Sequence, residues 1–212
     1  MRALRLSSSR AASAEDSTPR RVLSPHGSEG TLRRTIAVKT IIVLAMHGTL
    51  PNDLPHQDMD MLFALRAQIR RAAPEERARL EEQLRALDRR VRTWPRTPTN
   101  DPFYAASQAI AAQLSRLSRH EVVVAFNEFC APDVEEGLDI AVQRGAQRVI
   151  VLTPMLTRGG DHAEKEIPAA IARARQRHPT VTFLYAWPFA DEMIAQFLAD
   201  QIARFDALQP VS

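Results

Sequence analysis

Short apolar runs rich in β-branched residues alternate with helical segments from residue 40 onward, and this alternation constrains the fold more than any other feature of the chain. The first run, Thr40–Met46, is continuously apolar after its first residue, which is typical of a strand buried on both faces of a parallel sheet. Comparable runs follow at 121–126, 148–153 and 181–186. Because strands separated by helices form parallel sheets with helices on both faces, we predict an α/β domain built on a four-stranded parallel sheet.

Helical spacing fills the segments between these runs. Helices are expected from Pro102 to about Leu117, from Pro132 to Arg144, from Pro168 to His178 and from Asp191 to Leu208. Residues 56–93 predict a helical hairpin, because leucines at helical spacing stand on either side of Pro74. This hairpin is an insertion, and a lid, a dimer contact and a tolerated surface addition are all compatible with it.

The first 37 residues differ in composition from the rest. Residues 1–37 are rich in Ser, Arg and Ala without sustained periodicity, so we predict a disordered tail followed by one domain over 38–212. The composition also suits an organelle transit peptide, although Glu15 and Asp16 are atypical of one. Residues 1–38 carry seven Arg against three acidic residues, which leaves 21 basic and 22 acidic residues in the remainder. A nearly neutral remainder argues against a nucleic-acid-binding domain, which presents a basic face.

Hydropathy and cysteine content indicate the compartment. No apolar stretch approaches the ~18 residues that a membrane-spanning helix needs. Cys130 is the only cysteine, which excludes an internal disulfide and a cysteine-based metal cluster and fits a reducing cytoplasm. We therefore expect a cytoplasmic protein without nucleic-acid or membrane partners.

Three polar side chains stand just beyond the predicted strands, where open α/β sheets bind their ligands. His47 follows the first strand, Glu128 follows the second, and His162 lies in the Gly-rich loop after the third. Two imidazoles and a carboxylate in one crevice suit a transition-metal ion with room left for a substrate. Taken singly, each residue also fits a structural role, the His as hydrogen-bonding groups and the Glu as a helix cap or surface acid. The spacing alone leaves both interpretations open.

Several motifs occur in order on these elements. His47-Gly48-Thr49 ends the first strand, Ala125–Pro132 places Phe and Glu before a helix that starts with Pro, and Asp161–Pro168 contains His-x-x-x-Glu-Ile-Pro. In this order they resemble the sirohydrochlorin chelatase family, class II chelatases of the CbiX/SirB type, whose motifs are His-Gly-Ser, Phe-Leu-Glu and His-x-x-x-Asp-Ile-Pro. The similarity covers about residues 38–208 apart from the insertion. His26-Gly27-Ser28 spells the first motif more closely, but no strand precedes it.

The resemblance implies a chelatase-like half-domain in which His47 and His162 bind the metal and Glu128 acts as base or third ligand. It implies insertion of Co²⁺, Fe²⁺ or Ni²⁺ into a sirohydrochlorin-type tetrapyrrole in cobalamin or siroheme biosynthesis. The metal ion is then a substrate, and no permanent cofactor is implied. The carboxylates of the tetrapyrrole would meet Arg158. A single half-domain leaves its site open to water, so we expect a homodimer.

Two departures from the family pattern favour a second hypothesis, a non-catalytic metal or tetrapyrrole carrier on the same fold. Leu50 stands where an Arg usually follows His-Gly-Ser, and Glu166 replaces the shorter Asp. A nucleotide-binding Rossmann-like domain ranks last, because the loop after the first strand contains only Gly48 and no Gly-x-Gly-x-x-Gly motif.

Overall fold

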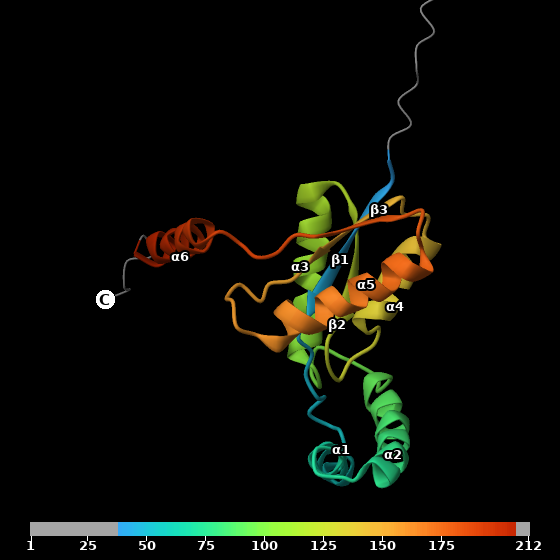
Figure 1. The fold of residues 1–212 in the computed structure, drawn as a ribbon. Coiled ribbons are helices and arrows are strands. Elements are labelled where there is room, and N and C mark those ends of the chain that lie inside the picture. Colours follow the sequence, from blue (N-terminus) through green and yellow to red (C-terminus); the bar gives the residue numbers. More distant parts are fainter. Residues whose placement is uncertain (1–37, 207–212) are drawn as a thin grey trace, which may run out of the picture. The chain divides into compact units, whose positions relative to one another are not determined.

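The computed structural model describes residues 38–206, in which a parallel sheet carries helices on both faces (Figure 1). The strands lie in the order β2-β1-β3-β4, and every neighbouring pair is parallel. Their bounds are β1 Thr40–Met46, β2 Glu121–Phe126, β3 Arg148–Leu152 and β4 Thr182–Tyr185. The predicted α/β fold with a four-stranded parallel sheet is confirmed. The predicted tail, with its transit-peptide alternative and its His26 motif, lies outside the described residues.

The helices follow the predicted order. They are α1 (His56–Ile69), α2 (Pro74–Arg92), α3 (Pro102–Ser118), α4 (Val134–Gln143), α5 (Ile167–Arg177) and α6 (Asp191–Asp206), with a short π-helix, η1 (His162–Glu166), before α5. Helix α4 begins two residues later than predicted because Asp133 caps it: the Asp133 side chain accepts from the Glu136 N–H, and the Glu136 side chain accepts from the Asp133 N–H. Asp101 caps α3 by accepting the Tyr104 N–H.

Two apolar layers surround the sheet. All residues of β1 are buried, as expected of a central parallel strand. On one face α4 and α5 cover side chains of β1, β2 and β3, among them Ile41, Val43 and Val149. Helix α4 packs closely because Gly137 has no Cβ; one built there would lie 2.6 Å from the Ala125 Cβ. The position of α4 therefore depends on this glycine.

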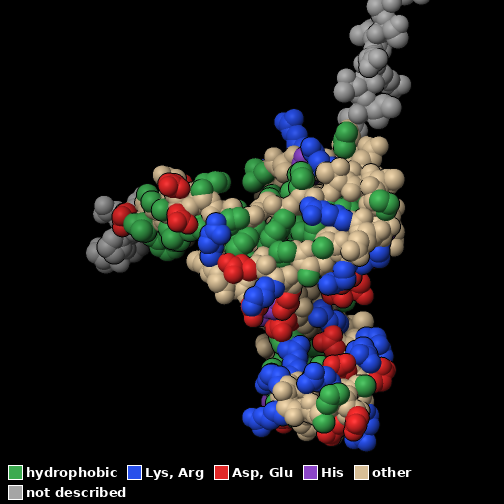
Figure 2. Space-filling model, viewed as in Figure 1, with side chains coloured by type: hydrophobic (Ala, Val, Ile, Leu, Met, Phe, Trp, Pro, Cys, Tyr) green, Lys and Arg blue, Asp and Glu red, His purple; other side chains and the backbone are tan. Residues whose placement is uncertain are grey.

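The opposite face of the sheet is covered only in part. Helix α3 packs against β2, and its Ala111 joins Leu44 and Phe126 in the same buried cluster. Leu184 of β4 points to the same face and is 45% exposed. Helix α6 follows β4 but has no buried residue, and Figure 2 shows hydrophobic side chains along it. No helix within residues 38–206 is both long and apolar enough to cross a bilayer.

The hairpin predicted at 56–93 is present as α1 and α2, and it has a core of its own. Its buried side chains are Leu54, Leu62, Leu65, Leu80, Leu87, Val91 and Phe129. Leu80 and Leu87 therefore pack inside the hairpin, with Leu84 against them, rather than on its surface. The outer surface is charged, as Figure 2 shows, and includes the Arg85–Glu82 ion pair at 2.7 Å.

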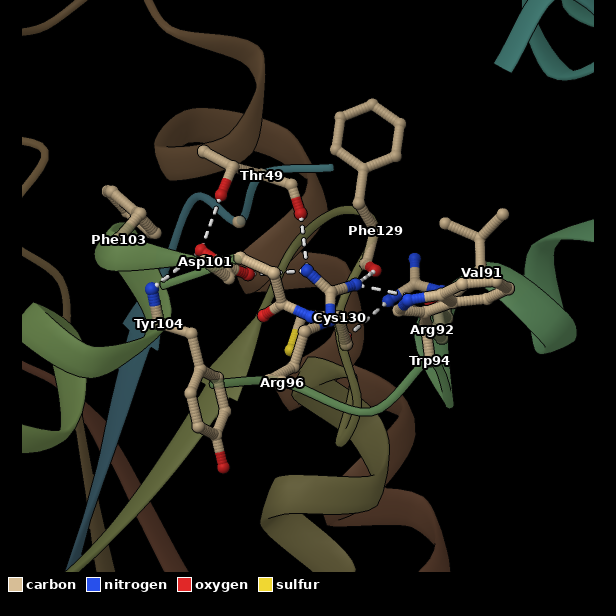
Figure 3. A network of polar contacts seen from close by, with 12 residues as sticks. Thr49, Val91, Arg92, Trp94, Arg96, Asp101, Phe103, Tyr104, Phe129 and Cys130 are labelled. Atoms are coloured by element: carbon tan, nitrogen blue, oxygen red, sulfur yellow. Dashed lines mark hydrogen bonds and ion pairs between the residues drawn. The ribbon is translucent and has the colours of Figure 1, made fainter. Parts of the chain in front are cut away.

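A buried ion pair between Arg96 and Asp101 joins this hairpin to the sheet (Figure 3). Arg96 also donates to the carbonyl oxygens of Val91 in α2 (3.1 Å), of Thr49 after β1 (2.8 Å) and of Phe129 after β2. Asp101 in turn accepts the Thr49 hydroxyl at 2.8 Å. The side chains of Arg96 and Asp101 are only 5% and 1% exposed. Three segments distant in sequence, namely residues 91–101, the loop after β1 and the loop after β2, thus meet at one charge pair.

We predict that Asp101→Asn lowers the free energy of unfolding by about 3–5 kcal/mol, because it leaves the Arg96 charge buried without a counter-ion. Asparagine caps helices as well as aspartate does, so the loss reports the charge and not the cap. Urea titration followed by circular dichroism measures it, with exposed Asp60→Asn as the control. A loss below about 1 kcal/mol, the value of a surface ion pair, would contradict the assignment.

Candidate metal centre

The three side chains predicted as ligands meet at one edge of the sheet. The ligand atoms of His47, Glu128 and His162 all lie within 4.8 Å of one another. The two imidazole rings stand edge to face, with their centres 4.8 Å apart. Ligand atoms that bind one ion at about 2.1 Å lie at most about 4.2 Å apart. Small side-chain rotations would therefore bring all three groups onto a single ion.

His47 and Glu128 converge because the loops after β1 and β2 are packed together. The Glu128 N–H donates to the His47 carbonyl at 2.8 Å, which extends the pairing of the two strands beyond their ends. Gly48 has a φ of +101°, and a Cβ there would lie 1.9 Å from the Glu128 carbonyl oxygen. Glycine is required at this position by both its backbone conformation and this close approach. The glycine of the His-Gly-Thr motif thus lets the two ligand loops touch.

The hydrogen bond of His47 determines which ring nitrogen is free. Its Nδ1 lies 2.9 Å from the Gly48 carbonyl oxygen, which can only accept. Nδ1 therefore carries the proton in the neutral ring, and Nε2 keeps the lone pair that a metal needs.

His162 is held in the same way by a carboxylate. This residue, predicted to lie in a loop, begins the π-helix η1. The Nδ1 of His162 lies 2.8 Å from Glu166 Oε2, one turn further along. Ligating histidines commonly donate their second N–H to a carboxylate, which fixes the ring and makes it a better ligand. Glu166, the departure from the Asp of the family motif, thus orients a predicted ligand.

Arg158 lies in the loop that precedes His162, and within the described residues no hydrogen bond or ion pair joins it to the three candidate ligands. Arg158 is exposed, and its guanidinium carbon lies 5.8 Å from the centre of the Trp187 ring. Pro154 and Leu156 of the same loop line an apolar hollow of about 430 Å³ together with the first turns of α6. Met155 instead packs against the core. The geometry keeps Arg158 available to an anionic ligand but does not bring it to the metal ligands.

Cys130 lies two residues after Glu128 and does not extend the ligand set. Its side chain is buried, and burial raises the pKa of the thiol to about 11. The protonated thiol therefore contributes to packing at neutral pH.

Two arginines of the insertion, which were not predicted as site residues, contact Glu128 and its loop. Arg66 of α1 donates to Glu128 Oε1 at 3.1 Å, although the two residues are 62 positions apart in the chain. Arg92 of α2 donates to the carbonyl oxygens of Asn127 and Cys130, both at 3.1 Å. One signal was present in the sequence: Arg66 stands four residues after Leu62, so it falls on the buried side of α1.

Comparison with protein families adds an independent finding. A family model described as CbiX matches residues 99–204, which is half of the chain. The matched half contains Glu128 and His162, whereas His47 and the helical hairpin precede it.

Curated relatives align over parts of the chain. This chain is 35% identical over 80 residues to the sirohydrochlorin ferrochelatase of Priestia megaterium. It is 43% identical over 67 residues to the sirohydrochlorin cobaltochelatase of the same organism. These alignments cover 37% and 32% of this chain. The sirohydrochlorin ferrochelatase of Bacillus subtilis (strain 168) is 32% identical over 96 residues, or 43% of this chain. The chain spans between 22% and 36% of the length of these relatives.

Solved structures include distant matches. The sirohydrochlorin chelatase SirB from Bacillus subtilis subspecies spizizenii, in complex with cobalt, is 20% identical with a TM-score of 0.35, covering 71% of this chain and 43% of that one. A CbiX protein from Marinobacter aquaeolei VT8 is 16% identical with a TM-score of 0.43, covering 80% of this chain and 98% of that one.

We predict that Glu166→Ala weakens the binding of Co²⁺ about 10–100-fold, because the His162 ring loses the group that orients it. Titration of the protein with CoCl₂, followed by calorimetry, measures the change. Glu192→Ala on α6 removes another exposed acid elsewhere and serves as the control. Equal affinities in the two variants would show that the Glu166–His162 contact does not support a metal ligand.

Proposed function

The chain belongs to the CbiX family, and we propose on that basis that it inserts a divalent metal ion, Co²⁺, Fe²⁺ or Ni²⁺, into a sirohydrochlorin-type tetrapyrrole. One observation carries the proposal: His47, Glu128 and His162 offer three ligand atoms within 4.8 Å at the edge of the sheet where α/β domains bind ligands. Imidazole and carboxylate suit these metals. The ion is a substrate of this reaction and passes on to the tetrapyrrole.

The chemistry requires an ion to be held loosely and two pyrrole N–H protons to be removed. The Nε2 atoms of His47 and His162 would hold the ion, because their Nδ1 atoms are already hydrogen-bonded. Glu128 would accept one of the pyrrole protons, as a general base placed beside the reacting nitrogen. The second proton would leave to an imidazole or to water. The His47 side chain is exposed, so a large planar substrate could reach the ligands.

The loop before His162 offers contacts for the parts of such a substrate that do not bind the metal ion. A tetrapyrrole of this type combines a flat apolar ring with carboxylates on its rim. The hollow lined by Pro154 and Leu156 offers apolar cover, and the exposed guanidinium of Arg158 offers a partner for a carboxylate. We propose that Arg158 makes this contact. The single free cysteine, Cys130, supports a cytoplasmic location.

We further propose a homodimer in which α6 supplies the contact. Five apolar side chains along α6 are each more than half exposed: Met193, Phe197, Leu198, Ile202 and Phe205. Leu184 of β4 is also exposed, and it lies on the part of the sheet that α3 does not cover. Helix α6 of a second copy could cover this strip, since identical subunits usually pair about a two-fold axis. The second copy would also shield the open site.

The proposed reaction is tested by His162→Ala. Insertion of Co²⁺ into sirohydrochlorin, followed by absorbance, should fall at least about 100-fold, because loss of a direct ligand should cost more than loss of a group that orients one. His26→Ala should leave the rate unchanged. Activity of His162→Ala within a factor of about two of the wild type would contradict the ligand role. A wild type that binds Co²⁺ without turnover would indicate the carrier instead.

The dimer is tested by light scattering at micromolar concentration. We expect a mass of about twice the 23.7 kDa of the chain, and a monomer for the double variant Phe197→Asp, Ile202→Asp, because buried unpaired carboxylates oppose association. Gln196→Asp, on the same helix, adds a charge outside the apolar set and should leave the dimer intact. A wild type that is active as a monomer of 23.7 kDa would refute the proposal.

A further inference from the structure

The helical hairpin touches the candidate metal centre through one side chain, Arg66. Its Nη1 lies 3.1 Å from Glu128 Oε1, and its guanidinium carbon lies 4.8 Å from the centre of the Phe129 ring. Its Nη2 lies 3.9 Å from Asp88 on α2. Arg66 is therefore held between a carboxylate of its own hairpin and a predicted metal ligand. The side chains of Arg66 and Glu128 are only 27% and 26% exposed, which limits their freedom to reorient.

The backbone on both sides of Glu128 is held by the same hairpin. Arg92 donates to the carbonyl oxygens of Asn127 and Cys130, and its own carbonyl accepts the Ala131 N–H at 3.1 Å. Asp88 pairs with Arg92 at 2.6 Å, and so links the two arginines. The loop that carries Glu128 thus has contacts to α2 along its whole length.

Phe129 adds a third constraint, which concerns the backbone conformation. It has a φ of 58°, in the left-handed region that non-glycine residues avoid. Such a conformation persists only where the surroundings stabilise it. The Phe129 side chain is 9% exposed and belongs to the apolar cluster of the hairpin, with Leu62 and Val91. Packing in the insertion therefore offsets the strain in the residue next to Glu128.

We propose that the insertion is a functional part of the metal centre, in which Arg66 is a positioning residue that holds one oxygen of Glu128 and leaves the other for the metal ion. This inference rests on the proposed function, because it takes Glu128 as a metal ligand. The two carboxylates of this cluster, Glu128 and Asp88, balance the charges of its two arginines. The main contribution of the Arg66 guanidinium is therefore orientation rather than repulsion of the ion. Its contacts to two carboxylates also make it a poor candidate for binding a substrate carboxylate directly.

The test is a cycle of variants in the full-length protein, read out by Co²⁺ affinity without tetrapyrrole. Arg66→Ala should weaken Co²⁺ binding about 10–100-fold, the usual effect of removing a group that orients a ligand. In a Glu128→Ala background the same substitution should cause no further loss, because Arg66 acts through Glu128. Arg70→Ala removes an exposed arginine one turn later and should leave the affinity unchanged.

Arg66→Lys keeps the charge and should restore part of the affinity, which a loss through unfolding of the hairpin would not allow. Unchanged or tighter Co²⁺ binding by Arg66→Ala, with binding still lost in His162→Ala, would overturn the role of Arg66 and leave the metal site standing. A higher KM for sirohydrochlorin with unchanged Co²⁺ affinity would likewise overturn it, in favour of a substrate contact. A wild type that binds none of Co²⁺, Fe²⁺ and Ni²⁺ would instead refute the proposed function.

Discussion

The buried pair of Arg96 and Asp101 is the interaction on which the rest of the site depends. Burying two charges costs several kcal/mol per ion, and this cost is recovered only where the geometry is good and further hydrogen bonds satisfy both groups. Here Thr49, Val91 and Phe129 supply such bonds, while the buried Nε of Arg96 has no hydrogen-bond partner among the described residues. Their segments can satisfy the pair together only in one mutual arrangement. The pair therefore determines how the loops after β1 and β2 meet the end of α2.

That arrangement gives each candidate ligand its own orienting partner. A backbone carbonyl accepts from the His47 ring, Glu166 accepts from the His162 ring, and Arg66 donates to Glu128. Two of these partners come from the α/β domain itself and the third comes from the insertion. The hairpin is thus joined to the centre by one ion pair and by the hydrogen bonds of Arg92 to the Glu128 loop, in addition to packing around its own core. An insertion that lay only on the surface would form neither the ion pair with Glu128 nor the hydrogen bonds of Arg92 to the Glu128 loop.

The sheet, and the convergence of the three candidate ligands, could be predicted because both follow from the local pattern of apolar strands and of the polar residues after them. Continuous apolar runs marked the strands, and β1 and β2 begin and end where the pattern predicts. His47 and Glu128 were found because parallel strands bring their carboxyl ends to one edge. The prediction that His162 lies in a loop was wrong. The Gly-rich segment before His162 has the composition of a loop, but the π-helix η1 begins at His162 itself. Glu166 was read as a departure and proved to be a hydrogen-bond partner.

The sequence by itself thus determined the fold class, the strand positions and the three residues that follow the strands, because hydrophobic periodicity reflects burial residue by residue. Only the tertiary structure decided what surrounds them. The contact between Arg66 and Glu128 joins residues 62 positions apart, and no spacing along the chain indicates that distance. The same holds for α6, whose apolar side chains the rest of the described chain leaves uncovered. Such contacts depend on how whole elements are placed, and that placement follows from packing and buried charge.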